Sequence, residues 1–488
     1  MKPILLIHGY SSDGNKNTDQ RIRQIYGGLP ELLKDIYGEA NVEAIDLSRW
    51  ISLDDGVSLD DIARAMDRAL KSDEYEHLLQ SGFHVVIHST GALVTRKWIH
   101  HYSPMPSPID SVIHLAGANF GSGLAHIGRG TMARWKRQIF DGTDVGKKVL
   151  QSLEFGCQET IDLHLSLSQP GNDILKDFGV KEYCVVGSQV PKLMRKLPNR
   201  YVKEDNSDCT VRASTSNLNF NFVILEPTAK AESLTAAEVK KWNKRRNSNK
   251  TIDDELYEIT GESFPEDEDR NVVPFGIAYE TAHIGKDLSI VDGRTTRDEM
   301  REFFEMIPLY PDAELTPDQY HEVVEQFTAK TARTYEQAAQ LPKEKDWNKQ
   351  EQYEAHAMVI FRIFDRDGKR IRDYDIYFKS TDRRSGKIKL ESLIEDNHYN
   401  KSDYTRSYYL RVQQFDGESW NNLLDNIGDM ELEVTALEPD SDEISYVPLS
   451  KKLPATYAQK IIRPFQTTIV DVVLERLPSK NVFRIIQH

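Results

Sequence analysis

The first 120 residues alternate short apolar runs with segments of helical periodicity, and this alternation restricts the possible folds most. Ile4–Ile7 and Phe83–Ile87 are almost wholly apolar, which is typical of strands buried on both faces of a sheet. Between them, Ser58–Ser72 has apolar residues at helical spacing, with Ser58 and Asp61 at capping-box positions. Such strands joined by helices indicate a mostly parallel sheet with right-handed crossovers. The fold class is therefore α/β.

Composition narrows the class of protein without indicating a reaction. The chain has 488 residues, with 62 Lys and Arg against 77 Asp and Glu, a net charge of −15. An acidic chain without a marked basic stripe argues against nucleic acid as a partner. We also expect no transmembrane segment, because no apolar run approaches the ~20 residues that a membrane helix needs.

The number of cysteines and the N-terminal sequence indicate the cellular compartment. Cys157, Cys184 and Cys209 are too few for a disulfide framework, which favours a reduced compartment. The N-terminus turns polar after a short apolar run, whereas a signal peptide needs an apolar stretch of about 7–15 residues. We therefore expect a cytoplasmic protein. Export by a route that needs no signal peptide stays an open alternative.

The sharpest motif is Val85–Leu93, where a buried strand leads into Ser89, then Gly91, then a helix. A nucleophilic serine needs this arrangement, because a strained turn lifts its hydroxyl above the sheet and small neighbours let strand and helix approach. Ile87 departs from the usual Gly-x-Ser-x-Gly, so its bulky side chain must find room where a hydrogen normally stands. The alternative interpretation is an ordinary serine on a strand-to-helix turn.

A second motif, Ile4–Ser11, ends the first strand at His8-Gly9. In a hydrolase of this architecture, the loop after that strand supplies one donor of the oxyanion hole. The other donor is the N–H of the residue after the nucleophile, at the N-terminus of the following helix. The two motifs therefore predict the backbone N–H groups of Tyr10 and Thr90 as the pair of donors. An ordinary strand exit with glycine at the turn is the alternative for His8-Gly9.

These motifs, with Leu115–Ser122 at a further strand end, resemble the lipase and esterase branch of the α/β-hydrolase superfamily over roughly residues 1–310. The resemblance implies a serine carboxylic-ester hydrolase, either a lipase, a phospholipase or an esterase. Such an enzyme cleaves acyl esters or lipids through a Ser-His-Asp triad and an acyl-enzyme intermediate. It requires no metal ion and no cofactor.

The family places its acid after the serine and before the histidine. Asp205–Arg212 is similar to the family's Asp-Gly-x-Val loop, which implies Asp208 as the acid, with Cys209 where glycine is usual. Asp205 is the competing carboxylate. For both residues the alternative is a solvated acidic turn, which Asp and Asn favour through local hydrogen bonds.

The same order limits the base to the histidines that follow the acid: His283, His321, His356, His398 and His488. His283 lies in Tyr279–Gly285, which resembles the family's His-x-Gly loop before the last helix. His321 falls inside a predicted helix among Glu and Gln, where a solvated surface position is expected. The resemblance therefore implies a triad of Ser89, Asp208 and His283.

The chain divides into three predicted parts. These are a catalytic domain at 1–310, with a lid or cap insertion at 119–181 and a charged excursion at 229–270, a helical connector at 311–351, and a β-sandwich or barrel at 352–488. The insertion covers the acyl pocket as a lid or stands as a rigid cap. The role of the β domain stays open between lipid or partner binding, dimerisation and stabilisation.

Two other readings of the function remain. An acyltransferase, thioesterase or amidase would use the same triad, and a non-catalytic hydrolase-like scaffold would bind a partner through its β domain. We expect no metal site, since the adjacent His100 and His101 face different sides of a helix. Transient contact with a lipid interface would rely on apolar lid surface, because the acidic chain does not favour anionic membranes.

Overall fold

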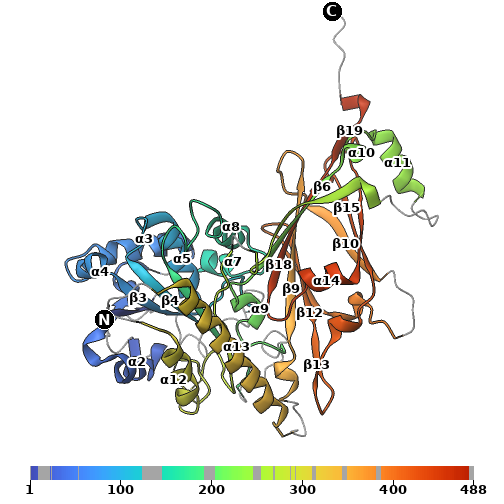
Figure 1. Ribbon diagram of the computed structural model, residues 1–488. Helices are drawn as coiled ribbons and strands as arrows, with labels where there is room; N and C mark the ends of the chain where they lie inside the picture. The colour runs from blue at the N-terminus through green and yellow to red at the C-terminus, as the bar shows by residue number, and fades with distance from the viewer. Residues whose placement is uncertain are drawn as a thin grey trace, which may run out of the picture. The chain divides into compact units, whose positions relative to one another are not determined.

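A six-stranded parallel sheet organises the first half of the chain in the computed structural model (Figure 1). Its order is β2-β1-β3-β4-β5-β8, and every neighbouring pair is parallel. This sheet confirms the predicted α/β class. The strands are β1 (Ile4–His8), β2 (Val42–Asp46), β3 (Phe83–His88), β4 (Ile109–Leu115), β5 (Lys181–Gly187) and β8 (Phe275–Ala278).

The chain forms two compact units. The first comprises Met1–Asn219, Glu266–Ala355 and Phe415–Ser419, and the second comprises Phe220–Pro265, His356–Gln414 and Trp420–His488. No helix in the described part of the chain combines the length and hydropathy that crossing a bilayer requires. The structure describes residues 2–8, 22–23, 25–52, 54–123, 146–191, 204–245, 254–267, 270–285, 287–291, 293–309, 315–342, 349–380 and 386–482.

Helices pack on both sides of the parallel sheet (Figure 1). α3 contacts α5 on one side, and α2 contacts α12 on the other. The predicted cap of α3 is present, since Ser58 and Asp61 form both bonds of a capping box. The helices of this unit are α2 (Leu29–Tyr37), α3 (Leu59–Leu70), α4 (Glu76–Ser81), α5 (Gly91–Tyr102), α7 (Lys147–Ser152), α8 (Gln158–Ser166), α9 (Ala213–Ser216), α12 (Arg297–Met306) and α13 (Pro317–Ala339).

The segment predicted as a helical connector packs on the parallel sheet. Its helix α13 contacts β8, where a Cβ added to Gly276 would lie 2.3 Å from a ring atom of Phe303. The Phe303 and Phe327 rings meet edge to face at this point, with centroids 5.1 Å apart. Glycine thus lets the aromatic side chains of two helices approach the edge strand, and α13 belongs to the first unit.

The predicted lid insertion is described in part. Its helices α7 and α8 contribute Val149 and Leu163 to the same hydrophobic core as α3 and α5, and Phe178 and Val180 join that core. These residues therefore fill the unit's interior. Residues 124–145, which include the rest of the Gly-rich entry, lie outside the described residues, so the lid stays a prediction.

The second unit is built mainly of β-strands. A six-stranded sheet has the order β11-β12-β9-β18-β6-β7, and a three-stranded sheet has the order β10-β15-β17. The β sheets that we predicted for the C-terminal part are therefore present. Their elements are β6 (Asn221–Pro227), β7 (Tyr257–Ser263), β9 (His356–Asp365), β10 (Asp373–Ser380), β11 (Ile394–Asn400), β12 (Thr405–Arg411), β15 (Met430–Leu437), β17 (Leu449–Leu453) and β18 (Thr467–Leu474), with α10 (Ala229–Glu232), α11 (Ala236–Arg245) and α14 (Ala455–Ile461).

One segment lies in a different unit from the one we expected. We placed 220–265 within the catalytic domain, and its larger part in a charged surface excursion, but β6 pairs in parallel with β18 through Asn221 and Thr468. β6 alternates buried and half-buried residues, whereas β3 is buried almost throughout. A strand with one covered face suits a sandwich better than the centre of a parallel sheet.

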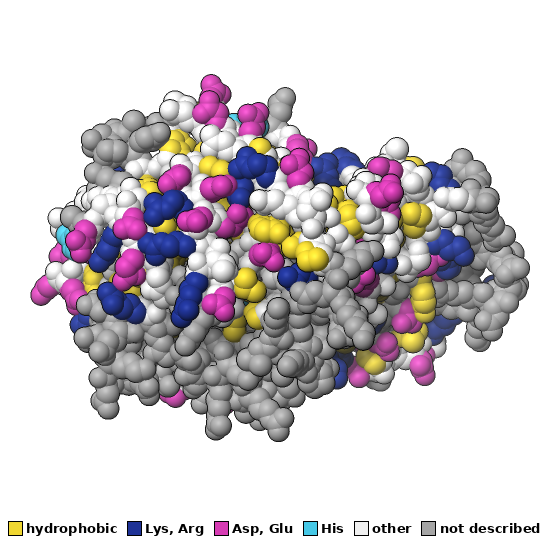
Figure 2. Space-filling model, turned by 90° about the horizontal axis from the view of Figure 1, so that it is seen from below, with side chains coloured by type: hydrophobic (Ala, Val, Ile, Leu, Met, Phe, Trp, Pro, Cys, Tyr) yellow, Lys and Arg dark blue, Asp and Glu magenta, His cyan; other side chains and the backbone are white. Residues whose placement is uncertain are grey.

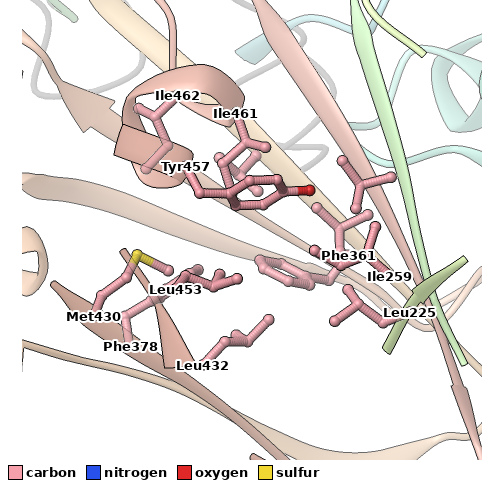
Figure 3. Close-up of a pocket in the computed structure, with 13 residues that line it drawn as sticks. Leu225, Ile259, Phe361, Phe378, Met430, Leu432, Leu453, Tyr457, Ile461 and Ile462 are labelled. Carbon is pink, nitrogen blue, oxygen red and sulfur yellow. The ribbon is translucent and has the colours of Figure 1, made fainter. Parts of the chain in front are cut away.

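An apolar cavity of about 20 Å³ lies between the two sheets of the second unit (Figure 3). Phe361 and Val470 line it from the six-stranded sheet, Phe378 and Leu432 from the three-stranded sheet, and Tyr457 from α14. Both inner faces are therefore covered by apolar side chains, as in a β-sandwich.

Basic and acidic side chains are interspersed on the face that Figure 2 shows. Small groups of hydrophobic side chains lie between them. In that view, the described surface has no single large area of one charge sign.

Candidate active site

Ser89 stands on the turn between β3 and α5, at the carboxyl edge of the parallel sheet. Its φ of 56° lies in the left-handed region, which costs a non-glycine residue about 1–3 kcal/mol. The Ser89 N–H donates to the Leu115 carbonyl at 3.1 Å, and the Ala118 N–H donates to the Ser89 carbonyl at 3.2 Å. These two backbone bonds tie the strained turn to the end of β4.

Ile87 finds its room among small neighbours. Its side chain is fully buried, and a Cβ added to Gly91 would lie 3.4 Å from the Ile87 Cβ. On the other side of the turn, a Cβ added to Gly117 would lie 3.1 Å from the Cβ of Ala92. Small residues after the serine and after β4 therefore let the helix start close to the strand despite the isoleucine.

The Asp208 carboxylate is fully buried and held by its own loop. Its Oδ1 accepts hydrogen bonds from the Thr210 N–H at 3.0 Å and the Val211 N–H at 2.7 Å. Its Oδ2 lies 2.8 Å from Nδ1 of His283. Backbone donors thus orient the carboxylate, and its second oxygen faces the imidazole.

Cys209 adopts the backbone conformation that explains why glycine is usual in this loop. Its φ is 80°, where a side chain is strained. The thiol is fully buried. Burial raises the pKa of Cys209, and the nearby Asp208 carboxylate raises it further. The thiol therefore stays protonated and neutral beside the carboxylate.

His283 lies on the loop after β8 and is 1% exposed. Its Nε2 is 3.1 Å from the Ser89 Oγ, and its backbone N–H donates to the Asp208 carbonyl at 3.0 Å. The loop is closed by the Ile290 N–H, which donates to the Ala282 carbonyl at 2.8 Å. The structure thus brings together all three predicted triad residues, from segments that follow three strands of one sheet.

The competing candidates lie elsewhere. Asp205 accepts a hydrogen bond from the Gln352 side chain at 2.6 Å. His321 lies on α13 with its side chain 67% exposed and its Nε2 3.8 Å from Glu325. His356 and His398 belong to strands of the second unit, and His488 lies outside the described residues.

Of the two predicted oxyanion donors, the structure describes one. Thr90 is 4% exposed and is the N-cap residue of α5, so its amide lies at the positive end of the helix dipole. Its N–H has no acceptor among the described residues. Tyr10 lies outside the described residues, so its role stays a prediction.

A buried ionic group under the site was not anticipated from the sequence. Arg96 on α5 and His114 on β4 both bond the carboxylate of Glu182 on β5, the histidine through Nε2 at 2.9 Å. Burial alone would raise the pKa of Glu182, but Arg96 and His114 lower it to about 2. This ion pair fastens the helix that follows Ser89 to the sheet.

No group of three His, Cys, Asp or Glu in the described residues is placed to hold a metal ion. The arrangement has the groups that acyl transfer requires. A carboxylate, an imidazole and a hydroxyl are hydrogen-bonded in series, and a helix N-terminus lies beside the hydroxyl.

The parallel sheet and the strained serine turn define an α/β-hydrolase fold. A phospholipase, PlaB from Legionella pneumophila, resembles the whole chain, with a TM-score of 0.75, 23% identity and coverage of 100% of this chain and 97% of that one. PlaB in complex with thio-NAD aligns with the same TM-score and coverage at 22% identity. This likeness confirms the predicted fold, including the appended β sheets.

A third structure, mature Bacillus licheniformis lipase BlEst2, covers 44% of this chain and 79% of its own, at 16% identity and a TM-score of 0.31. No protein-family model and no curated protein sequence matches the chain.

Proposed function

We propose that the protein is a serine hydrolase that cleaves acyl esters, with Ser89 as nucleophile, His283 as base and Asp208 as the orienting acid. The observation that carries this proposal is the position of His283, whose ring bonds Asp208 through Nδ1 and Ser89 through Nε2. The strained φ of Ser89 supports it, because strain of this kind is concentrated at functional sites.

The reaction follows from these positions. His283 Nε2 takes the Ser89 proton as Oγ bonds to the acyl carbon, and the carbonyl oxygen becomes an oxyanion beside the Thr90 N–H. The oxyanion collapses, the C–O bond to the alcohol breaks, and His283 returns the proton to the leaving alkoxide. Water then attacks the acyl-enzyme with His283 again as base, which releases the carboxylic acid and restores Ser89.

For the substrate class we propose lipid esters. The support is the full-length likeness to a protein described as a phospholipase, over both units of the chain. An acyltransferase, a thioesterase and an amidase would use the same three residues. Turnover measurements must therefore identify the group that accepts the acyl chain and the type of bond that is cleaved.

Labelling by a fluorophosphonate probe tests the reaction class. Wild-type protein should be labelled, and Ser89→Ala should not, with Ser122→Ala as a control because Ser122 is buried and donates to the Thr210 carbonyl. A non-catalytic scaffold would leave the wild type unlabelled, and that result would overturn the proposal.

Turnover of p-nitrophenyl esters of increasing chain length, with and without detergent micelles, tests the lipid assignment. Long acyl chains and a gain at the interface support it. A preference for the shortest esters with no gain from micelles would restrict the protein to small soluble esters.

A further inference from the structure

His88, which precedes the nucleophile, lies against the ring of the proposed base. The His88 and His283 ring centroids are 4.4 Å apart, with the ring planes tilted by 39°. His88 is the last residue of β3, and β3 is held in register on both sides by β1 and β4. The ring is therefore attached to a rigid strand, whereas His283 stands on a loop.

The His88 ring is also held against His283 by a hydrogen bond to the His283 backbone. Its Nε2 is buried and has no hydrogen-bond partner among the described residues. Burial lowers the pKa of His88 well below its usual range, and the nearby His283 lowers it further. The ring is therefore neutral and packs against His283 as a flat, uncharged surface.

Three other titratable groups face this pair of rings. The Asp208 carboxylate bonds the far side of His283, and the neutral Cys209 thiol stands beside that carboxylate. The Tyr26 hydroxyl is near the His88 backbone and donates to the Ile7 carbonyl at 2.7 Å, and burial raises its pKa.

We propose that His88 is a positioning residue for His283, its ring covering one face of the imidazole that bridges Asp208 and Ser89. The two hydrogen bonds of His283 act near the plane of its ring, so they resist displacement perpendicular to that plane least. A ring packed on the face supplies that resistance. This inference rests on the proposed function and adds a residue to its machinery.

The covering ring also keeps water from one face of His283. Removing it would let water solvate the imidazolium that His283 becomes when it is protonated. Protonation of the free enzyme would then become easier, and activity would be lost at a higher pH. Loss of a buried side chain that does not cover His283 would not produce this change.

The test compares His88→Ala with His84→Ala by steady-state kinetics over a range of pH. His84 is a matched control because it lies on the same strand, is 4% exposed, and has no hydrogen-bond partner for either ring nitrogen among the described residues. His88→Ala should lower kcat about 30-fold with KM within about twofold, since misplacing a catalytic group costs up to about 10²-fold. The acid limb of the kcat/KM profile of His88→Ala should move to higher pH. His84→Ala should match the wild type in kcat and in the pH profile.

A second pair of variants covers a failure of His88→Ala to fold. His88→Phe keeps a flat ring and His88→Leu keeps bulk without one, so Phe should retain about tenfold more kcat than Leu. Equal kcat values for these two, or a wild-type profile in a folded His88→Ala, would overturn the inference. An unlabelled wild type would instead overturn the proposed function, and this inference with it.

Discussion

Asp208 holds His283 at two points, with its carboxylate on the ring Nδ1 and its backbone carbonyl on the His283 N–H. The residue therefore fixes both the side chain and the main chain of the proposed base. Only the first contact depends on the charge of the carboxylate, so the two contacts can be separated by substitution.

Asp208→Asn should lower kcat roughly 10⁴-fold, because an amide that keeps its backbone bonds presents its NH₂ group to His283 and favours the wrong tautomer. Folding should be retained, since the Thr210 and Val211 N–H groups still find the amide oxygen. Single-turnover kinetics with a thermal melt measures both. Near wild-type turnover in Asp208→Asn would show that another carboxylate is the acid, and Asp205→Asn is the matched control.

His283→Ala should abolish turnover and slow fluorophosphonate labelling, because Ser89 then has no base within reach. His321→Ala should retain full activity, since that side chain is exposed on α13. Initial rates on one ester substrate compare the two. The reverse result would show that the base had been misassigned.

Cys209→Val should destabilise the protein by roughly 2–3 kcal/mol, because a β-branched residue is excluded from the left-handed region where Cys209 stands. Cys209→Gly removes that strain and should keep activity close to wild type. Urea unfolding and initial rates measure the two variants. Equal stability of the Val and Gly variants would contradict the argument from φ.

Stability should fall as the pH drops from about 6.5 to 5, before carboxylates titrate. Burial lowers the pKa of His84 to about 4 and that of His164 to about 3, so the unfolded chain binds protons in this range that the folded chain does not. The contribution is fully present above the unfolded pKa of about 6.5 and is lost as the pH falls.

Urea midpoints at several pH values measure this loss. His84→Gln should flatten the slope by up to about 1.4 kcal/mol per pH unit, the value for one proton. Parallel slopes for wild type and His84→Gln would show that His84 is protonated in the folded chain.

Filling the cavity of the second unit should stabilise it. Val470→Ile adds one methylene to the apolar lining, which contributes up to about 0.8 kcal/mol if it fits without strain. Val470→Ala should cost more than this gain, because it enlarges the cavity. Thermal unfolding of both variants is the measurement, and a loss of stability in Val470→Ile would show that the space is already closed.

The parts of the site that could be predicted from the sequence are those set by local chemistry. A buried strand, a serine and a glycine before a helix require one kind of turn, and Ser89 adopts it. The left-handed backbone conformation of Cys209 could be predicted in the same way, because a glycine is usual at this place in the family's loop.

The rest depends on contacts between residues distant in sequence. β6 pairs with β18 through Asn221 and Thr468, and no local sequence pattern in either strand predicts this pairing. The space for Ile87 likewise comes from the close approach of Gly91. The contact between His88 and His283 joins a strand end and a loop that lie far apart in the sequence, so no local spacing predicts it.

The chain leaves the hydrolase unit between its proposed acid and its proposed base. Asp208 precedes 220–265, and His283 follows it, while the β18 partner of β6 is not synthesised until residues 467–474. A ribosome therefore completes both sides of the triad before β6 can pair with β18, although β7 is already available on the other edge of β6. We expect the edge of β6 that later pairs with β18 to stay open until the end of translation, and to need protection in the nascent chain.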